Sequence, residues 1–200
     1  MPRQRHTIFC FLASFLFLPT VRAQAPAAVP VFKIEPIASS IKFHVDASTT
    51  IEGKFANWDA TLTFSSTDVS TGVLDIKIQA DSVDTGSGMK NGKLKGKDFF
   101  DVKQNPLITF KSTKVEQTGP DTFELLGDFT IRGVTRPEKL TLTVSGRGTG
   151  SGTIMGTMAF DRKDYGMNSG IPFIKIADRV EVNVSLKGER ISGPPLVFKQ

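Results

Sequence analysis

The chain has 200 residues and a mass of 21.8 kDa, a size that suits one domain or at most two small ones. Apolar residues make up 39% of it and charged residues 22%, and these values exclude wholesale disorder and a collagen-like structure. The formal net charge is +5 at pH 7, which raises the question of a nucleic-acid partner.

The first 23 residues have the three parts of a secretory signal peptide. Arg3 and Arg5 form a basic start, residues 8–18 are an apolar run, and small residues follow around Ala23. A membrane-spanning helix needs about twenty apolar residues, so the short run favours cleavage over anchoring. We therefore expect residues 1–23 to be a signal peptide. No later segment is apolar enough to span a membrane as a helix, so we expect no membrane span after cleavage.

Cleavage would change the chemistry of the chain. It removes Arg3, Arg5 and Arg22 and no acid, which lowers the formal charge from +5 to +2. The remaining basic residues are scattered among acids, so we predict no nucleic-acid partner. Cleavage also removes Cys10 and leaves His44 as the single histidine. Within one subunit this excludes disulfides, cysteine nucleophiles and Cys/His or two-histidine sites, and we predict no metal.

Beyond an Ala/Pro-rich leader at residues 24–30, apolar and polar residues alternate with a period of two. The pattern predicts eight half-buried strands, within residues 40–45, 59–64, 74–80, 108–112, 123–131, 140–146, 154–160 and 180–186. Gly-rich or polar turns of lengths typical of antiparallel neighbours separate them. Residues 89–102 lack the alternation, and we interpret them as short helical turns that cover one end.

Eight strands with one apolar face must close or fold over to hide that face and the sheet edges. We predict a single all-β domain at residues 31–190, an antiparallel up-and-down β-barrel with a short helical insertion, followed by a tail at 191–200. Alternation does not say which face points inward, so an outer-membrane barrel is the alternative. A soluble barrel is favoured because only Trp58 and Tyr165 are available, besides phenylalanines within the apolar alternation, to form interfacial girdles.

Such a barrel can be filled by side chains or can hold one small ligand. The predicted inward set mixes large residues such as Phe110 and Phe129 with small ones such as Gly127 and Gly156. The mixture fits an elongated cavity and a packed core equally well. The alternation alone therefore leaves both open.

Six stretches of sequence, in order, carry a family resemblance. They are residues 39–43 (SSIKF), 53–58 (GKFANW), 98–110 (from DFFDV to PLITF), 127–137 (GDFTIRGVTRP), 161–167 (DRKDYGM) and 178–182 (DRVEV). Together they resemble the YceI-like family of bacterial periplasmic proteins over about residues 31–188. The resemblance implies a periplasmic, lipocalin-like barrel whose apolar tunnel binds a polyisoprenoid, an isoprenoid quinone or a similar amphiphile. This chain departs from the family at residues 90–94 and at Glu138, where many members have Arg-Asp-x-His-Leu and an apolar residue.

On this basis we predict which side chains line the tunnel. They are inward, mostly large and apolar: Phe43, Phe55, Trp58, Leu62, Phe64, Ile76, Ile78, Phe110, Phe129, Ile131, Leu142, Met158, Phe160 and Val182. Four residues after a strand end, Arg162, Asp164, Tyr165 and Asn168, could form a polar mouth that donates to a ligand head group. Pairing of Arg162 with Asp164 across the loop is the equally weighted alternative.

Two further groups of residues have more ordinary interpretations. Arg132 and Arg136 could meet an anionic head group, but a tight turn that requires Gly133 and Pro137 explains residues 127–137 better. His44 falls on the polar face of its strand, which favours a solvated side chain over a catalytic base.

Catalysis has little support in the sequence. The remaining carboxylate pairs, Asp98 with Asp101 and Asp161 with Asp164, fall on predicted loops, where acids are usually solvated or capping. We therefore predict a non-catalytic carrier with no cofactor, whose partner is an apolar lipid-like molecule. The alternative is a protein-interaction or stress-related module with a filled core, which docks through an exposed edge or through Phe99 and Phe100. A homodimer is left open.

Overall fold

The computed structural model describes residues 28–48, 50–170 and 175–199. Within these residues the chain forms eleven strands, one α-helix and four short 3₁₀ helices. The strands are β1 (Val31–Ile34), β2 (Ser40–Ala47), β3 (Ile51–Phe55), β4 (Trp58–Thr63), β5 (Val73–Gln79), β6 (Val83–Asp84), β7 (Leu107–Gln117), β8 (Thr122–Ile131), β9 (Val134–Ser145), β10 (Ser151–Asp161) and β11 (Ile176–Ser192). The helices are α1 (Gly88–Lys95), η1 (Pro36–Ala38), η2 (Val69–Thr71), η3 (Ala80–Ser82) and η4 (Arg162–Tyr165). The predicted signal peptide and most of the leader lie outside the described residues.

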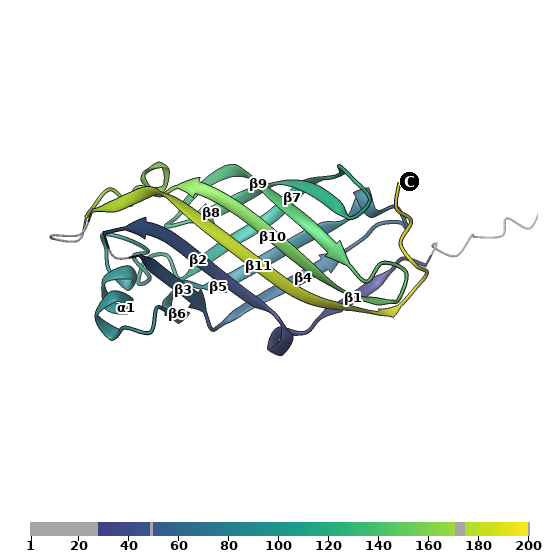
Figure 1. The fold of residues 1–200 in the computed structure, drawn as a ribbon, viewed down its shortest axis with the longest axis horizontal. Coiled ribbons are helices and arrows are strands. Elements are labelled where there is room, and N and C mark those ends of the chain that lie inside the picture. Colours follow the sequence, from purple (N-terminus) through teal and green to yellow (C-terminus); the bar gives the residue numbers. More distant parts are fainter. Residues whose placement is uncertain (1–27, 49, 171–174, 200) are drawn as a thin grey trace, which may run out of the picture.

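The strands form one antiparallel, strongly curled sheet (Figure 1). Its order is β4-β5-β7-β8-β9-β10-β11-β2-β3-β6, and β1 pairs with β11 beside this path. The antiparallel all-β prediction is confirmed, but the count of eight strands is wrong. The additional strands are β1, β3 and β6, of four, five and two residues. They are too short, or in β3 too interrupted by Gly53, to show a clear alternation.

The two ends of this strand order meet through the chain itself. The ladder does not continue from β6 back to β4, but β3 leads into β4 through Ala56 and Asn57. There the Ala56 N–H donates to the Ser82 carbonyl at 3.1 Å, and the Gln79 N–H donates to the Asn57 carbonyl at 3.0 Å. The first bond continues the β3–β6 pairing and the second continues the β4–β5 pairing, so the covalent link from β3 to β4 is what joins the two ends of the sheet.

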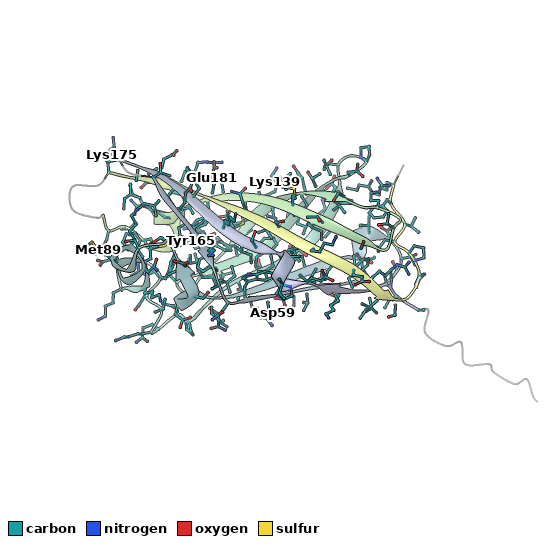
Figure 2. All side chains as sticks on the ribbon, turned by 60° about the horizontal axis from the view of Figure 1, so that its bottom comes forward. Asp59, Met89, Lys139, Tyr165, Lys175 and Glu181 are labelled. Carbon is teal, nitrogen blue, oxygen red and sulfur yellow. The ribbon has the colours of Figure 1, made fainter. Side chains whose placement is uncertain are left out.

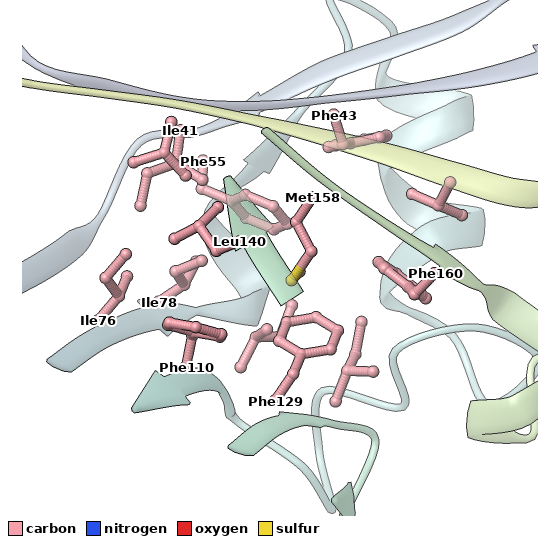
Figure 3. Packing of buried hydrophobic residues seen from close by; sticks show 14 of the residues in the cluster. Ile41, Phe43, Phe55, Ile76, Ile78, Phe110, Phe129, Leu140, Met158 and Phe160 are labelled. Carbon is pink, nitrogen blue, oxygen red and sulfur yellow. The ribbon is translucent and has the colours of Figure 1, made fainter. Parts of the chain in front are cut away.

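The apolar residues of the alternation point into the curled sheet and form its core. Figure 3 shows Phe110, Phe129, Met158 and Phe160 converging there from different strands. All fourteen residues predicted to line a tunnel belong to this core or pack against it. Burial of a large apolar side chain contributes about 1.5–3 kcal/mol, so this interior is the main source of stability.

Glycines on the inner face make room for neighbouring side chains. A Cβ atom on Gly127 would lie 2.7 Å from the Phe110 ring, and one on Gly156 would lie 2.7 Å from Leu142. Real Cβ atoms do not approach other atoms this closely, so at both positions the space is already filled. The small residues therefore do not by themselves create the elongated cavity with which the sequence pattern is compatible.

The turns and the insertion agree with the sequence in most respects. Between β8 and β9, Arg132 and Gly133 both have positive φ, 53° and 73°, which is the two-residue hairpin turn predicted there. Pro137 is not part of that turn, because it pairs with Asp128 within the β8–β9 ladder. Figure 1 shows α1 at one end of the sheet, as the insertion was predicted to lie, with the C-terminal residues at the other end.

Candidate functional site

Three cavities with mainly apolar linings lie inside the curled sheet. The largest, about 140 Å³, lies under the C-terminal residues and the turn between β9 and β10, and we name it the tail-end cavity. The second, about 80 Å³, lies toward α1 and is named the helix-end cavity. A third of about 30 Å³ lies deeper and shares Ile41, Ile78, Phe129 and Val182 with the helix-end cavity. We call it the middle cavity.

The linings of the two larger cavities differ in polarity. Among the described residues around the helix-end cavity, Arg162 is the one side chain that is not apolar. The tail-end cavity is also mainly apolar, but Arg147 and Arg190 stand at it beside Ser145, Ser151 and several glycines. An apolar chain fits both, and the polar edge is at the tail end.

Thirteen of the fourteen predicted lining residues stand at one of these cavities. Around the tail-end cavity are Leu62, Phe64 and Leu142, while Phe43, Phe55, Ile78, Phe129, Ile131, Phe160 and Val182 line the helix-end cavity. Ile76, Phe110 and Met158 line the middle cavity. Trp58 lines none of the three and packs, half-buried, against the core. That these residues contact a ligand stays a prediction.

The alternation did not identify every lining residue. Phe99 and Phe100 follow α1, are 5% and 8% exposed, and close over the helix-end cavity with Leu94. The idea that they form an exposed docking segment is therefore wrong. Leu196 and Phe198 line the tail-end cavity from beyond the last strand. Their apolar character, in a tail predicted to continue past the last strand, was the only signal.

Arg162 is a buried clamp for the backbone. Only 8% of its side chain is exposed, and Nε donates to the Ala177 carbonyl at 3.1 Å. Nη1 donates to the carbonyls of Met167 and of Ser169, and Nη2 to Asp178 at 3.1 Å. All of these acceptors lie on the segment that follows η4. Arg162, which lines the helix-end cavity, therefore ties Met167 and Ser169 to the start of β11 through four of its five N–H donors.

Asp178 receives a second cation from the surface. Lys163 Nζ lies 2.7 Å from its other carboxylate oxygen, and this lysine is half exposed. The hydrogen bond from Lys163, helped by the charge of Arg162, holds the pKa of Asp178 below its usual value. The Asp178 carboxylate is therefore ionised near neutral pH, where it pairs with Arg162 and Lys163.

Tyr165 is buried completely and packs against two phenylalanines that also contact each other, with ring centroids 5.0 Å apart. Its ring packs edge-on against Phe129 and Phe160, with centroids 5.4 and 5.2 Å away. Its hydroxyl donates to Glu138 Oε1 at 2.7 Å. Burial, with the hydrogen bond to this carboxylate, raises the pKa of Tyr165 above its ordinary value. Glu138 therefore satisfies a buried hydroxyl.

The remaining residues of the predicted polar mouth are outside the cavities. Asp164 and Asn168 are exposed, and the Asp164 carboxylate lies 3.8 Å from Nη2 of Arg136. Arg136 Nε also donates to the Asp164 carbonyl, and Arg132 donates to the Gly166 carbonyl. The suggested pairing of Arg162 with Asp164 is wrong, because the two side chains have different partners. Arg132 in the β8–β9 turn and Arg136 in β9 thus both bind the backbone of residues 164–166.

The polar outer face shows no constellation suited to catalysis by its geometry. His44 lies there, 3.1 Å from Asp46 and 3.3 Å from Glu52, and its hydrogen bonds to these carboxylates raise its pKa. Lys139 and Glu181 point away from the sheet in Figure 2. In the part of the chain that the structure describes, no cluster of His, Cys, Asp or Glu could hold a metal ion.

None of the helices in the described residues is both long and apolar enough to cross a membrane.

Comparisons with known proteins agree with this architecture. The family model of the YceI-like domain matches residues 32–188. A UPF0312 protein of Pseudomonas aeruginosa (strain LESB58) is 29% identical over 143 residues, which are 69% of this chain and 73% of that relative.

Two solved structures have the same fold at low sequence identity. BcnA of Burkholderia cenocepacia is similar with a TM-score of 0.70 and 24% identity, over 78% of this chain and 99% of BcnA. A polyisoprenoid binding domain from Saccharophagus degradans, implicated in plant cell wall breakdown, is similar with a TM-score of 0.64 and 15% identity. That match covers 80% of this chain and 99% of the domain.

Proposed function

The chain belongs to the YceI-like domain family, and from that premise we propose that it is a non-catalytic carrier of an amphiphilic lipid. The ligand class is a polyisoprenoid, an isoprenoid quinone or a similar molecule with one long apolar chain. Support for this class comes from the fold shared with the polyisoprenoid binding domain of Saccharophagus degradans and from the apolar interior of this chain.

One observation carries the proposal: the three cavities follow one another inside a single curled sheet, and their walls are almost wholly apolar. Such an interior gives a hydrocarbon chain about 0.8 kcal/mol for each CH₂ removed from water. It offers a charged or strongly polar solute little in return for lost hydration. The best-fitting ligand is therefore long and apolar, with its polar end at the sheet's edge.

The cavity volumes set how such a ligand is accommodated. An apolar cavity of about 150 Å³ can take up benzene, so the tail-end cavity, at about 140 Å³, has room for roughly one isoprene unit. A longer chain must join the separate cavities, which requires side chains between them to change rotamer. Leu140, which lines the middle cavity, and Leu142, which lines the tail-end cavity, lie on the same face of β9 between the two. We propose that ligand binding moves them.

We also propose a periplasmic location. The basic, apolar and small-residue parts of residues 1–23 support it, as does the resemblance of this chain to a family of bacterial periplasmic proteins. Fractionation of cells that express the full chain tests this: the protein is expected in the periplasmic fraction at the mass of the cleaved form. Full-length protein in the cytoplasm would contradict the proposal.

A second candidate function is an interaction module that binds no lipid. It is favoured by the filled space between the cavities, where glycines are already packed against Phe110 and Leu142. In that case the small cavities are ordinary packing defects, and the ordered exterior carries the function.

Native mass spectrometry of detergent-free protein, followed by organic extraction, separates the two candidates. The carrier predicts a stoichiometric isoprenoid or quinone, or uptake of added geranylgeraniol by empty protein. Phe129→Asp is expected to abolish uptake, because it places a charge between the helix-end and middle cavities. Phe129→Leu is the milder variant that keeps the fold, and Thr130→Asp on the opposite face is the matched control. Empty wild-type protein that takes up no geranylgeraniol would favour the interaction module.

A further inference from the structure

The C-terminal segment, residues 193–199, crosses the end of the curled sheet beyond the last strand (Figure 1). Leu196 and Phe198 are half-buried and line the tail-end cavity, whereas Val197 between them is 61% exposed. This alternation is that of a strand laid over an apolar interior. Pro195 also lines the cavity. The segment thus covers the cavity with its own side chains.

Hydrogen bonds to the backbone of this segment hold it at two places. Near η2, the Val197 N–H donates to the Thr67 carbonyl at 2.8 Å, and the Val69 N–H donates to the Val197 carbonyl at 3.2 Å. At the end of β7, Gln117 Oε1 accepts from the Lys199 N–H at 2.7 Å, and Gln117 Nε2 donates to the Lys199 carbonyl at 2.9 Å. All four bonds involve only Val197 and Lys199 of the segment.

Phe198 is held by a separate set of contacts. Its ring lies edge-on to Phe123 at a centroid distance of 6.2 Å, and the Arg147 guanidinium lies over it at 4.3 Å. Asp121, 3.0 Å from Arg147, keeps that guanidinium in place. Phe198 therefore occupies an aromatic and cationic site at the edge of the cavity, where a flat or unsaturated apolar group fits equally well.

The segment begins at a residue suited to act as a hinge. Gly193 has a φ of +78°, and a Cβ atom there would clash with the backbone of Val29. The family match ends at residue 188, so the hinge and the covering residues lie beyond it. The cover therefore lies outside the part of the chain that matches the family model.

We propose that the tail-end cavity is the entrance for the apolar ligand and that the C-terminal segment is its displaceable closure. This rests on the proposed function and names the route into the same site. The segment occupies the entrance in cis, and the incoming chain replaces Leu196 and Phe198 in their apolar contacts. The segment swings away about Gly193, and Arg147 is left beside the ligand at the polar edge.

The physical reason to assign the entrance to this end is the nature of its contacts. The segment lies beyond the last strand and is held by half-buried side chains and four hydrogen bonds, so its release breaks the contacts described above without moving any strand. At the other end, Phe99 and Phe100 lie between α1 and β7, and Arg162 binds four partners across the η4 segment. Opening there requires loss of buried hydrogen bonds within the middle of the chain.

Stopped-flow uptake of N-phenyl-1-naphthylamine, an apolar dye that fluoresces when sheltered from water, tests the closure. Phe198→Ala removes the ring contacts, and Val197→Pro removes the N–H that binds Thr67. Each is expected to accelerate dye association by about fivefold, the factor that corresponds to about 1 kcal/mol of lost holding contacts. Ile191→Ala, an equally exposed apolar residue before the hinge, is the matched control and is expected to keep the wild-type rate.

Hydrogen exchange of the Val197 amide gives an independent result. Saturation of the wild-type protein with the dye is expected to speed this exchange, because the bond to Thr67 opens. Slower exchange, or equal association rates in folded Phe198→Ala, Val197→Pro and wild-type protein, would overturn the closure while the carrier function stands. If no form takes up the dye or geranylgeraniol, both proposals are overturned.

Discussion

The two ends of the curled sheet are covered in different ways. At the helix end, Leu94, Phe99 and Phe100 come from the middle of the chain, and the buried Arg162 ties the neighbouring segment to four acceptors. At the tail end, the cover is the segment beyond β11, in which Phe198 is half-buried and Val197 exposed. The cover at the helix end is part of the buried core, whereas the cover at the tail end lies on the surface of that core.

This difference shows how one apolar interior can be both stable and accessible. Free energy of folding is concentrated where side chains are fully buried and polar groups are fully satisfied. A cover held by a few half-exposed contacts can open locally without global unfolding. Substitutions at the two ends should therefore separate stability from ligand access.

The largest contrast is expected between two phenylalanines. Phe160→Ala is predicted to lower the free energy of unfolding by about 4 kcal/mol, because it leaves a void beside Phe129 and Tyr165. Phe198→Ala is predicted to cost only about 1 kcal/mol, since its ring is half-buried at a free end. Urea titrations of both variants measure the difference. Equal losses would show that the tail is as integral to the fold as the helix end.

Arg162→Met examines the clamp at the helix end. It is predicted to cost about 3 kcal/mol, because several carbonyls and Asp178 lose a buried donor that methionine cannot replace. Lys163→Met removes the other, half-exposed partner of Asp178 and is expected to cost less than about 1 kcal/mol. Thermal unfolding of the pair provides the measurement. A larger effect at Lys163 would mean that the surface pair, not the buried one, holds the segment.

A smaller effect is expected from Tyr165→Phe. The ring and its contacts with Phe129 and Phe160 remain, but half-buried Glu138 loses its hydroxyl donor, at a cost of about 1–2 kcal/mol. Glu138→Gln keeps a carbonyl acceptor for the hydroxyl and should be closer to wild type. Chemical denaturation of both variants decides whether this bond or the ring packing matters. If Tyr165→Phe is neutral, ring packing alone fixes the two phenylalanines.

Most strands of the curled sheet could be predicted from sequence, because the alternation that marks a strand is visible within a few consecutive residues. Alternation in β8, as in Phe123, Leu125, Phe129 and Ile131, repeats every second residue and marks the inward face. The pattern failed in β3, where Gly53 replaces the central apolar residue because the Phe43 ring occupies that space. Such a replacement depends on a neighbouring strand, and no local rule contains it.

The covers of the two ends were less predictable for the same reason. Arg162 was assigned to a polar mouth because a charged side chain is usually exposed. Its burial depends on carbonyls up to fifteen residues away that converge only in the fold. Residues 193–199 include two prolines and were predicted to be part of a tail after the last strand. Their contacts with Thr67, Gln117 and Arg147 span most of the chain.

The smallest expected effect is a pH dependence at the tail end. At the start of η2, the Asp68 carboxylate accepts a hydrogen bond from the Ser70 N–H at 2.8 Å. The backbone of Asp68 also forms an isolated parallel β-bridge with that of Val197. The bond from Ser70, with a lesser contribution from the charge of Lys199, lowers the pKa of Asp68 below its ordinary value of 3.8. The ionised carboxylate therefore stabilises this docking site above pH 3.8, and the stabilisation is lost as the pH falls below that value.

Hydrogen-exchange protection of the Val197 amide, corrected for the intrinsic pH dependence of exchange, measures the effect. Wild-type protection is expected to decrease modestly below pH 3.8, whereas Asp68→Asn, which keeps an oxygen acceptor but cannot ionise, should show a flat profile. Amides of β8 serve as the internal control, because their bonds lie in the middle of the sheet. A parallel decrease in β8 would mean that acid loosens the whole sheet. Asp178 at the helix end also has a lowered pKa, but the hydrogen bonds from Arg162 to backbone carbonyls do not titrate, so we expect acid to release the tail before the helix end.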